Sequence, residues 1–204
     1  MNDQSATDTM LAYMANRTLT RARELKVQGV SGTAISRAVA SGVILRVGRG
    51  LYQLPDADID THISLVEVAT QAPKAVICLI SALSFHGLTD QLPRKVWIAI
   101  GTKDWAPKSS SISIRPVRFR EPYFSNGIET HTIGGVDVRL YSVSKSIADA
   151  FRNPKLVDRS VAIECLKSAL ETRRATVGDI AHAASQYGVA KRMGPYLEAL
   201  SANG

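Results

Sequence analysis

The segment from Val30 to Pro55, VSGTAISRAVASGVILRVGRGLYQLP, carries the side chains whose types and spacing best suit chemistry. Ser31 can cap a helix that buries the stripe Ile35, Ala38 and Val39 and ends before Gly42. The other face of that helix then presents Thr33, Ser36, Arg37 and Ala40. Small polar side chains and one guanidinium suit contacts with base edges in the major groove of DNA. An ordinary solvated helix surface is the alternative interpretation.

Two more arginines follow this helix. The segments VILRV and LYQLP read as strands, and Gly48, Arg49 and Gly50 join them at a length that hairpins use. A hairpin beside the helix would place Arg46 and Arg49 along the phosphate backbone or the minor groove. A phosphate-binding loop is disfavoured, because Gln53 occupies the third glycine position of G-x-G-x-x-G and a strand follows.

The elements before residue 30 must position these side chains. Residues 5–17 and 21–29 have helical spacing, with Thr20 as the expected cap and Gly29 as the expected end of the second helix. Arg21 and Arg23 face water there, where they can contact flanking phosphates. Three helices and a hairpin predict a winged helix-turn-helix over residues 1–55, and its polar face favours DNA over protein contacts.

The positive net charge of the sequence suits a negatively charged partner. The 204 residues have a net charge of +7 and a sequence pI near 9.6. Residues 1–55 hold seven basic and three acidic side chains, against 18 and 15 in the rest. The apolar runs are shorter than a membrane helix, the first residues do not resemble a signal peptide, and Cys78 and Cys165 suggest reduced thiols. We expect a cytoplasmic protein without a membrane partner.

A second domain follows. Residues 56–62 predict a linker, and residues 63–204 predict a mixed α/β domain with a mostly antiparallel sheet and C-terminal helices. Asn126-Gly127 and Gly134-Gly135 are the expected hairpin turns. Thr176 and Asp179 form a capping box. The expected fold class is therefore α+β.

Catalytic patterns in this second domain are incomplete. Ser142 to Lys145 fits S-x-x-K, but the S-D-N and K-T-G partners are missing. Asp137 lacks the Glu-x-Lys that a metal-dependent nuclease strand carries, and His86 reads as a packed structural histidine. We expect no catalytic residue, metal or cofactor. The arginine and aromatic residues of 115–123 suit either a solvated strand face or contacts with RNA or protein.

The segments RARELKVQGVSGTAISRAVASGVILRVGRGLYQLP, SALSFHGL and RLYSVSKSIADAFR resemble the AbiEi family of antitoxins and transcriptional regulators. The match to the family pattern GxLxRVxRGxY is most specific up to Pro55. Asp149 stands where the family has an aspartate, and we expect it to cap or pair within a helical corner.

The resemblance implies an antitoxin of a two-gene pair that represses its own promoter at inverted repeats on double-stranded DNA. It further implies a nucleotidyltransferase-like toxin as functional partner, with direct contact between the two left open. The alternative is a stand-alone regulator with a ligand-binding or protein-binding second domain. A nucleic-acid-processing enzyme is a third class, which metal-dependent turnover would identify.

Overall fold

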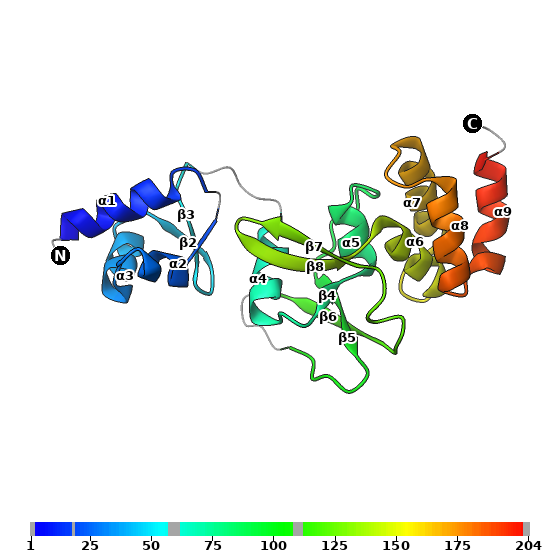
Figure 1. Cartoon of the computed structure of the whole chain (residues 1–204), viewed down its shortest axis with the longest axis horizontal. Helices are drawn as coiled ribbons and strands as arrows, with labels where there is room; N and C mark the ends of the chain where they lie inside the picture. The colour runs from blue at the N-terminus through cyan, green and yellow to red at the C-terminus, as the bar shows by residue number, and fades with distance from the viewer. Residues whose placement is uncertain (1–2, 18, 57–61, 108–111, 202–204) are drawn as a thin grey trace. The chain divides into compact units, whose positions relative to one another are not determined.

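The computed structural model describes residues 3–17, 19–56, 62–107 and 112–201. The chain divides into two compact units, which Figure 1 shows in one view. The first comprises the described residues of Met1–Thr70 and Thr132–Asp137, and the second those of Gln71–His131 and Val138–Gly204. The predicted linker lies largely outside the described residues, because 57–61 are not described, and the boundary assigned to it stays a prediction.

The first unit holds four helices and a small sheet among its described residues. They are α1 (Asp3–Met14), β1 (Thr20–Arg21), α2 (Ala22–Val27), α3 (Gly32–Ala40), β2 (Leu45–Gly48), β3 (Leu51–Gln53) and α4 (Ile63–Gln71, whose last residue counts with the second unit). The sheet has the order β1-β3-β2, and both pairings are antiparallel. Helices and hairpin follow each other as in a winged helix, in agreement with the prediction.

The core of the first unit explains this arrangement. Helix α1 buries Met10 and Met14 at a spacing of four, and α3 contributes Ile35 to the same cluster. Leu25 of α2 and Ile44 at the start of the hairpin are fully buried beside them. Each helix therefore turns one apolar stripe inward and leaves its other faces to solvent.

One element here was not predicted. Thr20 was the expected helix cap, but it lies in β1 and pairs with Tyr52 of β3. The N-cap of α2 is Arg21. The reason is that residues 20 and 21 form the third strand of the small sheet. A strand of two residues is too short to show an alternating pattern in the sequence.

The second unit combines a five-stranded sheet with a helical C-terminal part. Its elements are β4 (Val76–Ile77), α5 (Leu79–Phe85), β5 (Val96–Gly101), β6 (Ile114–Phe119), β7 (Ile128–Ile133), β8 (Val136–Tyr141), α6 (Val143–Arg152), α7 (Arg159–Glu171), α8 (Val177–Gln186) and α9 (Ala190–Ser201). The turn between β7 and β8 counts with the first unit, together with the strand ends beside it (Thr132–Asp137). In Figure 1, α7, α8 and α9 gather around α6 at one end of the sheet.

The sheet has the order β6-β5-β4-β8-β7 and is mixed, so the prediction of a mostly antiparallel sheet was wrong. Strand β5 pairs in parallel with β6 and β4 pairs in parallel with β8, while β4 and β5 are antiparallel. Because β5 and β6 are parallel, a hairpin cannot join them. Asn126-Gly127 is likewise no hairpin turn, because β6 and β7 are opposite edges of the sheet.

Buried thiols and caps agree with the sequence. Cys78 and Cys165 are free and buried in one apolar cluster of the second unit. The capping box at the start of α8 is present: the Asp179 amide donates to Thr176 Oγ1 at 3.1 Å, and Asp179 Oδ2 accepts from the Thr176 amide at 2.9 Å. Among the described residues no helix combines the length and the apolarity needed to span a membrane.

Candidate nucleic-acid interface

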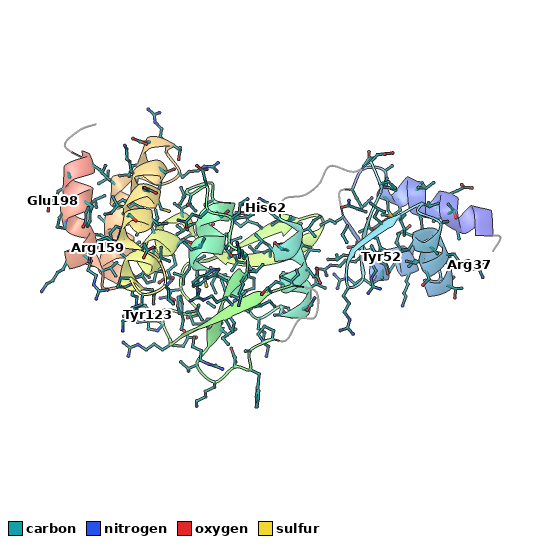
Figure 2. The ribbon with its side chains drawn as sticks, turned by 180° about the vertical axis from the view of Figure 1, so that it is seen from behind. Arg37, Tyr52, His62, Tyr123, Arg159 and Glu198 are labelled. Atoms are coloured by element: carbon teal, nitrogen blue, oxygen red, sulfur yellow. The ribbon has the colours of Figure 1, made fainter. Side chains whose placement is uncertain are left out.

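Helix α3 presents the predicted polar face. Its first turn is fixed by Ser31, whose Oγ accepts a hydrogen bond from the Ala34 amide at 3.2 Å. Because Ala34, Ile35 and Ala38 are buried, the helix exposes Thr33, Ser36, Arg37 and Ala40. Figure 2 shows Arg37 on the outer side of α3. The face therefore offers two hydroxyls and a guanidinium, with no bulky side chain between them.

The hairpin is joined directly to this helix. The amides of Val43 and Ile44 both donate to the Ala38 carbonyl, at 2.9 and 3.3 Å, so the chain leaves α3 in a fixed direction. Gly42, with φ of 74°, makes the left-handed turn that this exit requires. The loop after β2 then turns at Gly50, with φ of 72°, into β3.

Backbone pairing collects three of the predicted basic residues at the hairpin. Arg21 is the strand partner of Leu51, and the Ala22 amide donates to the Gly50 carbonyl at 2.9 Å. Arg21 and Arg23 therefore flank the turn that carries Arg49. Arg23 and Arg49 are exposed. We call Arg21, Arg23 and Arg49 the hairpin group.

Arg21 differs from the other two members of this group. It is half-buried, its Nε is buried without a hydrogen-bond partner among the described residues, and its amide donates to Glu24 Oε2 at 2.8 Å. Burial, followed by the neighbouring charge of Arg23, lowers the pKa of Arg21. Its backbone thus holds α2 in place, whereas a phosphate contact by its side chain stays a prediction.

Arg46 lies on β2 opposite Tyr52, and its Nε donates to the Gly48 carbonyl at 3.2 Å. That bond lies beside the irregular register between Arg46 and Gly48. The pairing thus places Arg46 on strand β2 of the hairpin, ahead of the turn that carries Arg49. The side chains predicted to contact DNA therefore form two sets: those on the face of α3, and the arginines of the hairpin.

The second unit contains a buried charged pair, Lys145 and Asp149, and the sequence predicted a pairing role for Asp149 alone. Lys145 Nζ lies 2.6 Å from both Oδ atoms of Asp149, one helical turn away on α6. Burial lowers the pKa of Lys145 and raises the pKa of Asp149 to about 6. The negative charge of Asp149 opposes the first shift, and the positive charge of Lys145 opposes the second. The prediction that Asp149 pairs within a helical corner is confirmed.

Aromatic rings surround this ammonium group. Lys145 Nζ lies 4.4 Å from the ring centroid of Tyr187, 4.7 Å from that of Tyr141 and 5.2 Å from that of Phe119. Ser142, the first residue of the S-x-x-K match, caps α6 by accepting from the Lys145 amide at 3.3 Å. Its hydroxyl therefore has a structural partner in the cap. The position of His86 is structural as well, since its Nε2 lies 2.8 Å from the Tyr141 carbonyl oxygen.

The chain is similar to known proteins in its overall fold and in the sequence of its first unit. The whole chain resembles the crystal structure of the RV2827C protein from Mycobacterium tuberculosis, with a TM-score of 0.62 and 11% identity over 97% of this chain and 77% of that one. At this identity the likeness shows a shared fold alone. No curated protein matches the sequence. Residues 21–55, which carry α2, α3 and the hairpin, match the family model described as transcriptional regulator, AbiEi antitoxin, and this confirms the family resemblance seen in the sequence.

Proposed function

We propose that this chain is a DNA-binding antitoxin that represses its own promoter and counters a nucleotidyltransferase-like toxin. The observation that carries the proposal is the polar face of α3 next to the arginines of the hairpin, within residues 21–55 that match a family of transcriptional regulators. In this reading the chain has no catalytic activity of its own and acts in the cytoplasm.

The first unit reads the operator as a winged helix-turn-helix. Thr33, Ser36 and Arg37 approach base edges, where a guanidinium can bind guanine in bidentate fashion. Arg46 and the hairpin group hold the phosphate backbone or the minor groove, which gives affinity without sequence information. Inverted repeats in the operator would be occupied by two copies of the chain, as two-fold recognition requires.

Fluorescence anisotropy with the chain's own upstream DNA and with a scrambled duplex, at several salt concentrations, tests this reading. We expect tight binding to the upstream duplex alone and weaker binding as salt rises. Arg49→Ala should weaken binding to both duplexes and flatten the salt slope by about one unit, because one phosphate contact is lost. Arg159→Ala, an exposed residue of the second unit on α7, is the matched control with an equal loss of charge.

Equal and weak binding to the two duplexes would contradict operator reading and leave the first unit a nonspecific or protein-contacting module. An Arg49→Ala variant with the salt slope of the unchanged protein would remove the hairpin from the interface.

Toxin neutralisation is assigned to the second unit. Its test is co-expression with a neighbouring gene that encodes a nucleotidyltransferase-like protein, scored by growth. We expect the full chain to restore growth and Arg49→Ala to restore it equally, since that variant changes the first unit. Loss of rescue in Arg49→Ala would show that neutralisation needs the DNA-binding surface. No rescue by the unchanged chain would favour a stand-alone regulator.

A further inference from the structure

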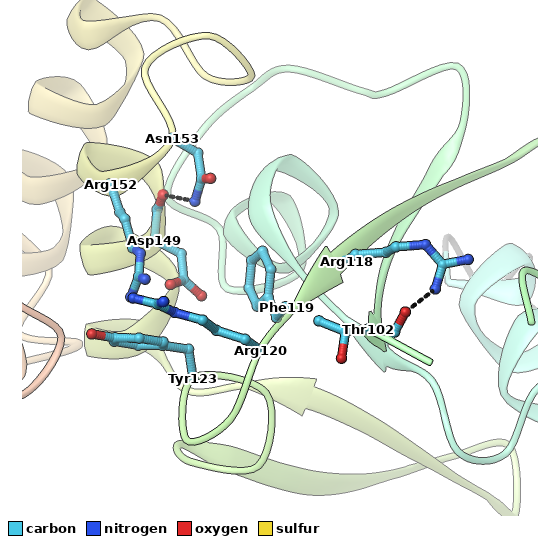
Figure 3. Close-up of a pocket in the computed structure, with 8 residues that line it drawn as sticks. All are labelled: Thr102, Arg118, Phe119, Arg120, Tyr123, Asp149, Arg152 and Asn153. Atoms are coloured by element: carbon cyan, nitrogen blue, oxygen red, sulfur yellow. Dashed lines mark hydrogen bonds between the residues drawn. The ribbon is translucent and has the colours of Figure 1, made fainter. Parts of the chain in front are cut away.

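The second unit contains a cavity of about 320 Å³ that the proposed function does not use. It opens between the end of β6, the turn that follows and the last turn of α6, as Figure 3 shows. Its lining consists of Thr102, Arg118, Phe119, Arg120, Tyr123, Asp149, Arg152 and Asn153. Three of these side chains are arginines, and one is a carboxylate.

The carboxylate does not neutralise the arginines. Both oxygens of Asp149 are already bound by Lys145 Nζ, and the two side chains of this pair are 1% and 0% exposed. The Asp149 backbone is also engaged, because its carbonyl accepts from Asn153 Nδ2 at 2.8 Å. The described walls of the cavity therefore keep an excess of positive charge.

The guanidinium groups are held in place. The Arg152 guanidinium carbon lies 3.3 Å from the ring centroid of Tyr123, and that of Arg120 lies 5.8 Å from the same centroid. Arg118 Nη1 donates to three carbonyls at and after the end of β5, those of Gly101, Thr102 and Asp104, at 3.1, 3.0 and 2.7 Å. In Figure 3 the groups of Arg120 and Arg152 lie beside Tyr123, and Arg118 reaches toward Thr102.

One of these donors has no acceptor. Arg152 Nη1 is buried and lacks a hydrogen-bond partner among the described residues. A buried donor without an acceptor is costly, and two like charges on one aromatic ring repel each other. An anion in the cavity would relieve both costs, and planar guanidinium groups match the oxygen geometry of phosphate.

We propose that this cavity binds a small phosphate-bearing molecule between Arg120 and Arg152. Its volume lies at the lower end of the range of ligand sites, which suits inorganic phosphate, pyrophosphate or a compact phosphate ester. Phe119 and Tyr123 supply an apolar wall for the carbon part of an ester. The proposal is independent of DNA binding by the first unit, because every lining residue belongs to the second.

Isothermal titration of the full chain with inorganic phosphate, pyrophosphate and ADP, each alone, tests the proposal and separates the sources of the phosphate group. A single-stranded oligonucleotide is the fourth titrant, since it carries the same group in a polymer. We expect saturable binding of at least one of the three small phosphates with a Kd below about 1 mM. Arg120→Gln and Arg152→Gln should each weaken it roughly tenfold or more, because each removes a charged donor.

Arg159→Gln is the matched control, with an equal loss of charge on α7 outside the cavity, and its affinity should equal that of the unchanged protein. Arg120 is exposed, so its variant should keep the circular dichroism spectrum of the unchanged chain even if Arg152→Gln alters α6. The proposal is overturned if none of the small phosphates binds, if only the oligonucleotide binds, or if Arg159→Gln weakens binding as much as Arg120→Gln.

Discussion

Two regions of the molecule, one in each unit, place their charges in opposite ways. In the first unit the polar and basic side chains assigned to DNA lie on the surface of α3 and the hairpin, around an apolar core. In the second unit a lysine and an aspartate lie inside the core itself. Exposed charges contribute little to folding and are available to partners, whereas buried charges depend on each other. Substitutions of the exposed side chains of α3 and the hairpin should therefore change DNA binding, and substitutions in the buried pair should change stability.

The largest expected effect breaks the buried pair. Asp149→Asn leaves the Lys145 ammonium buried without a carboxylate, and we expect the free energy of unfolding to fall by about 3–5 kcal/mol. Urea denaturation followed by circular dichroism measures the loss. The double variant Lys145→Met with Asp149→Leu replaces both charges by apolar groups and should recover most of it. A double variant as unstable as Asp149→Asn would mean that the pair stabilises the unit beyond satisfying its own charges.

The next prediction concerns Arg37, the exposed counterpart. Arg37→Ala should reduce discrimination between the operator and single base-pair substitutions by about 1–3 kcal/mol at one position. Its free energy of unfolding should stay within about 0.5 kcal/mol of that of the unchanged protein. Anisotropy with a set of substituted duplexes measures the first quantity and urea denaturation the second. Uniform weakening on all duplexes would reassign Arg37 to a phosphate contact.

A smaller effect is expected where the first unit does depend on a polar side chain. Ser31→Ala removes the acceptor for the Ala34 amide and should cost about 1 kcal/mol in stability. Hydrogen exchange of the α3 amides locates the loss. Ser36→Ala on the same helix is the control, since Ser36 is exposed and outside the cap. If both variants exchange alike, the cap does not hold α3.

The smallest effect is a pH dependence in the second unit. Burial is the main cause that lowers the pKa of His86 from 6.5, so the unfolded chain takes up its proton first as the pH falls. The contribution of neutral His86 to the free energy of unfolding is therefore complete above pH 6.5, and it is lost as the pH falls below that value. The backbone bond to Tyr141 and the charge of Glu129 oppose this shift, while His131 and Arg174 add to it.

The thermal unfolding midpoint, compared between the unchanged chain and His86→Gln from pH 7 to pH 5, measures this contribution. Asp149 is present in both proteins, so its titration cancels when their midpoints are compared at the same pH. The two midpoints should converge on acidification. A difference that is constant with pH would show that His86 has the same pKa in both states.

Local signals in the sequence predicted the elements that depend on local chemistry. Ser31, Gly42 and Gly50 mark the ends of α3 and the hairpin turn, because a cap and two left-handed residues act within a few positions. Thr176 and Asp179 mark α8 in the same way. Pairing over longer distances was not predictable from such signals, and the parallel strands and β1 were missed for that reason.

The burial of Lys145 had no signal in the sequence. Val143, Ile147, Ala150 and Phe151 lie on one side of α6, and Lys145 and Asp149 lie on the other, so the pattern predicts an exposed pair although both residues are buried. The one local signal concerns the pairing itself, because Asp149 stands at the spacing of four that allows contact with Lys145. Two of the cavity arginines, Arg118 and Arg120, lie in the stretch 115–123 that the sequence marked as rich in arginine and aromatic residues. Their convergence with Arg152 had no signal, because Arg152 comes from α6.

The long-range pairing has a consequence for how the chain folds. Residues 3–53 meet each other within a short stretch of sequence, while Ile77 of β4 must wait for Leu140 of β8. Contacts between distant residues form slowly, and a ribosome delivers the N-terminus first. The helices and hairpin of the first unit can therefore assemble while the central strands of the second are still unpartnered, so a nascent chain has the surface proposed to bind DNA before it has its second core.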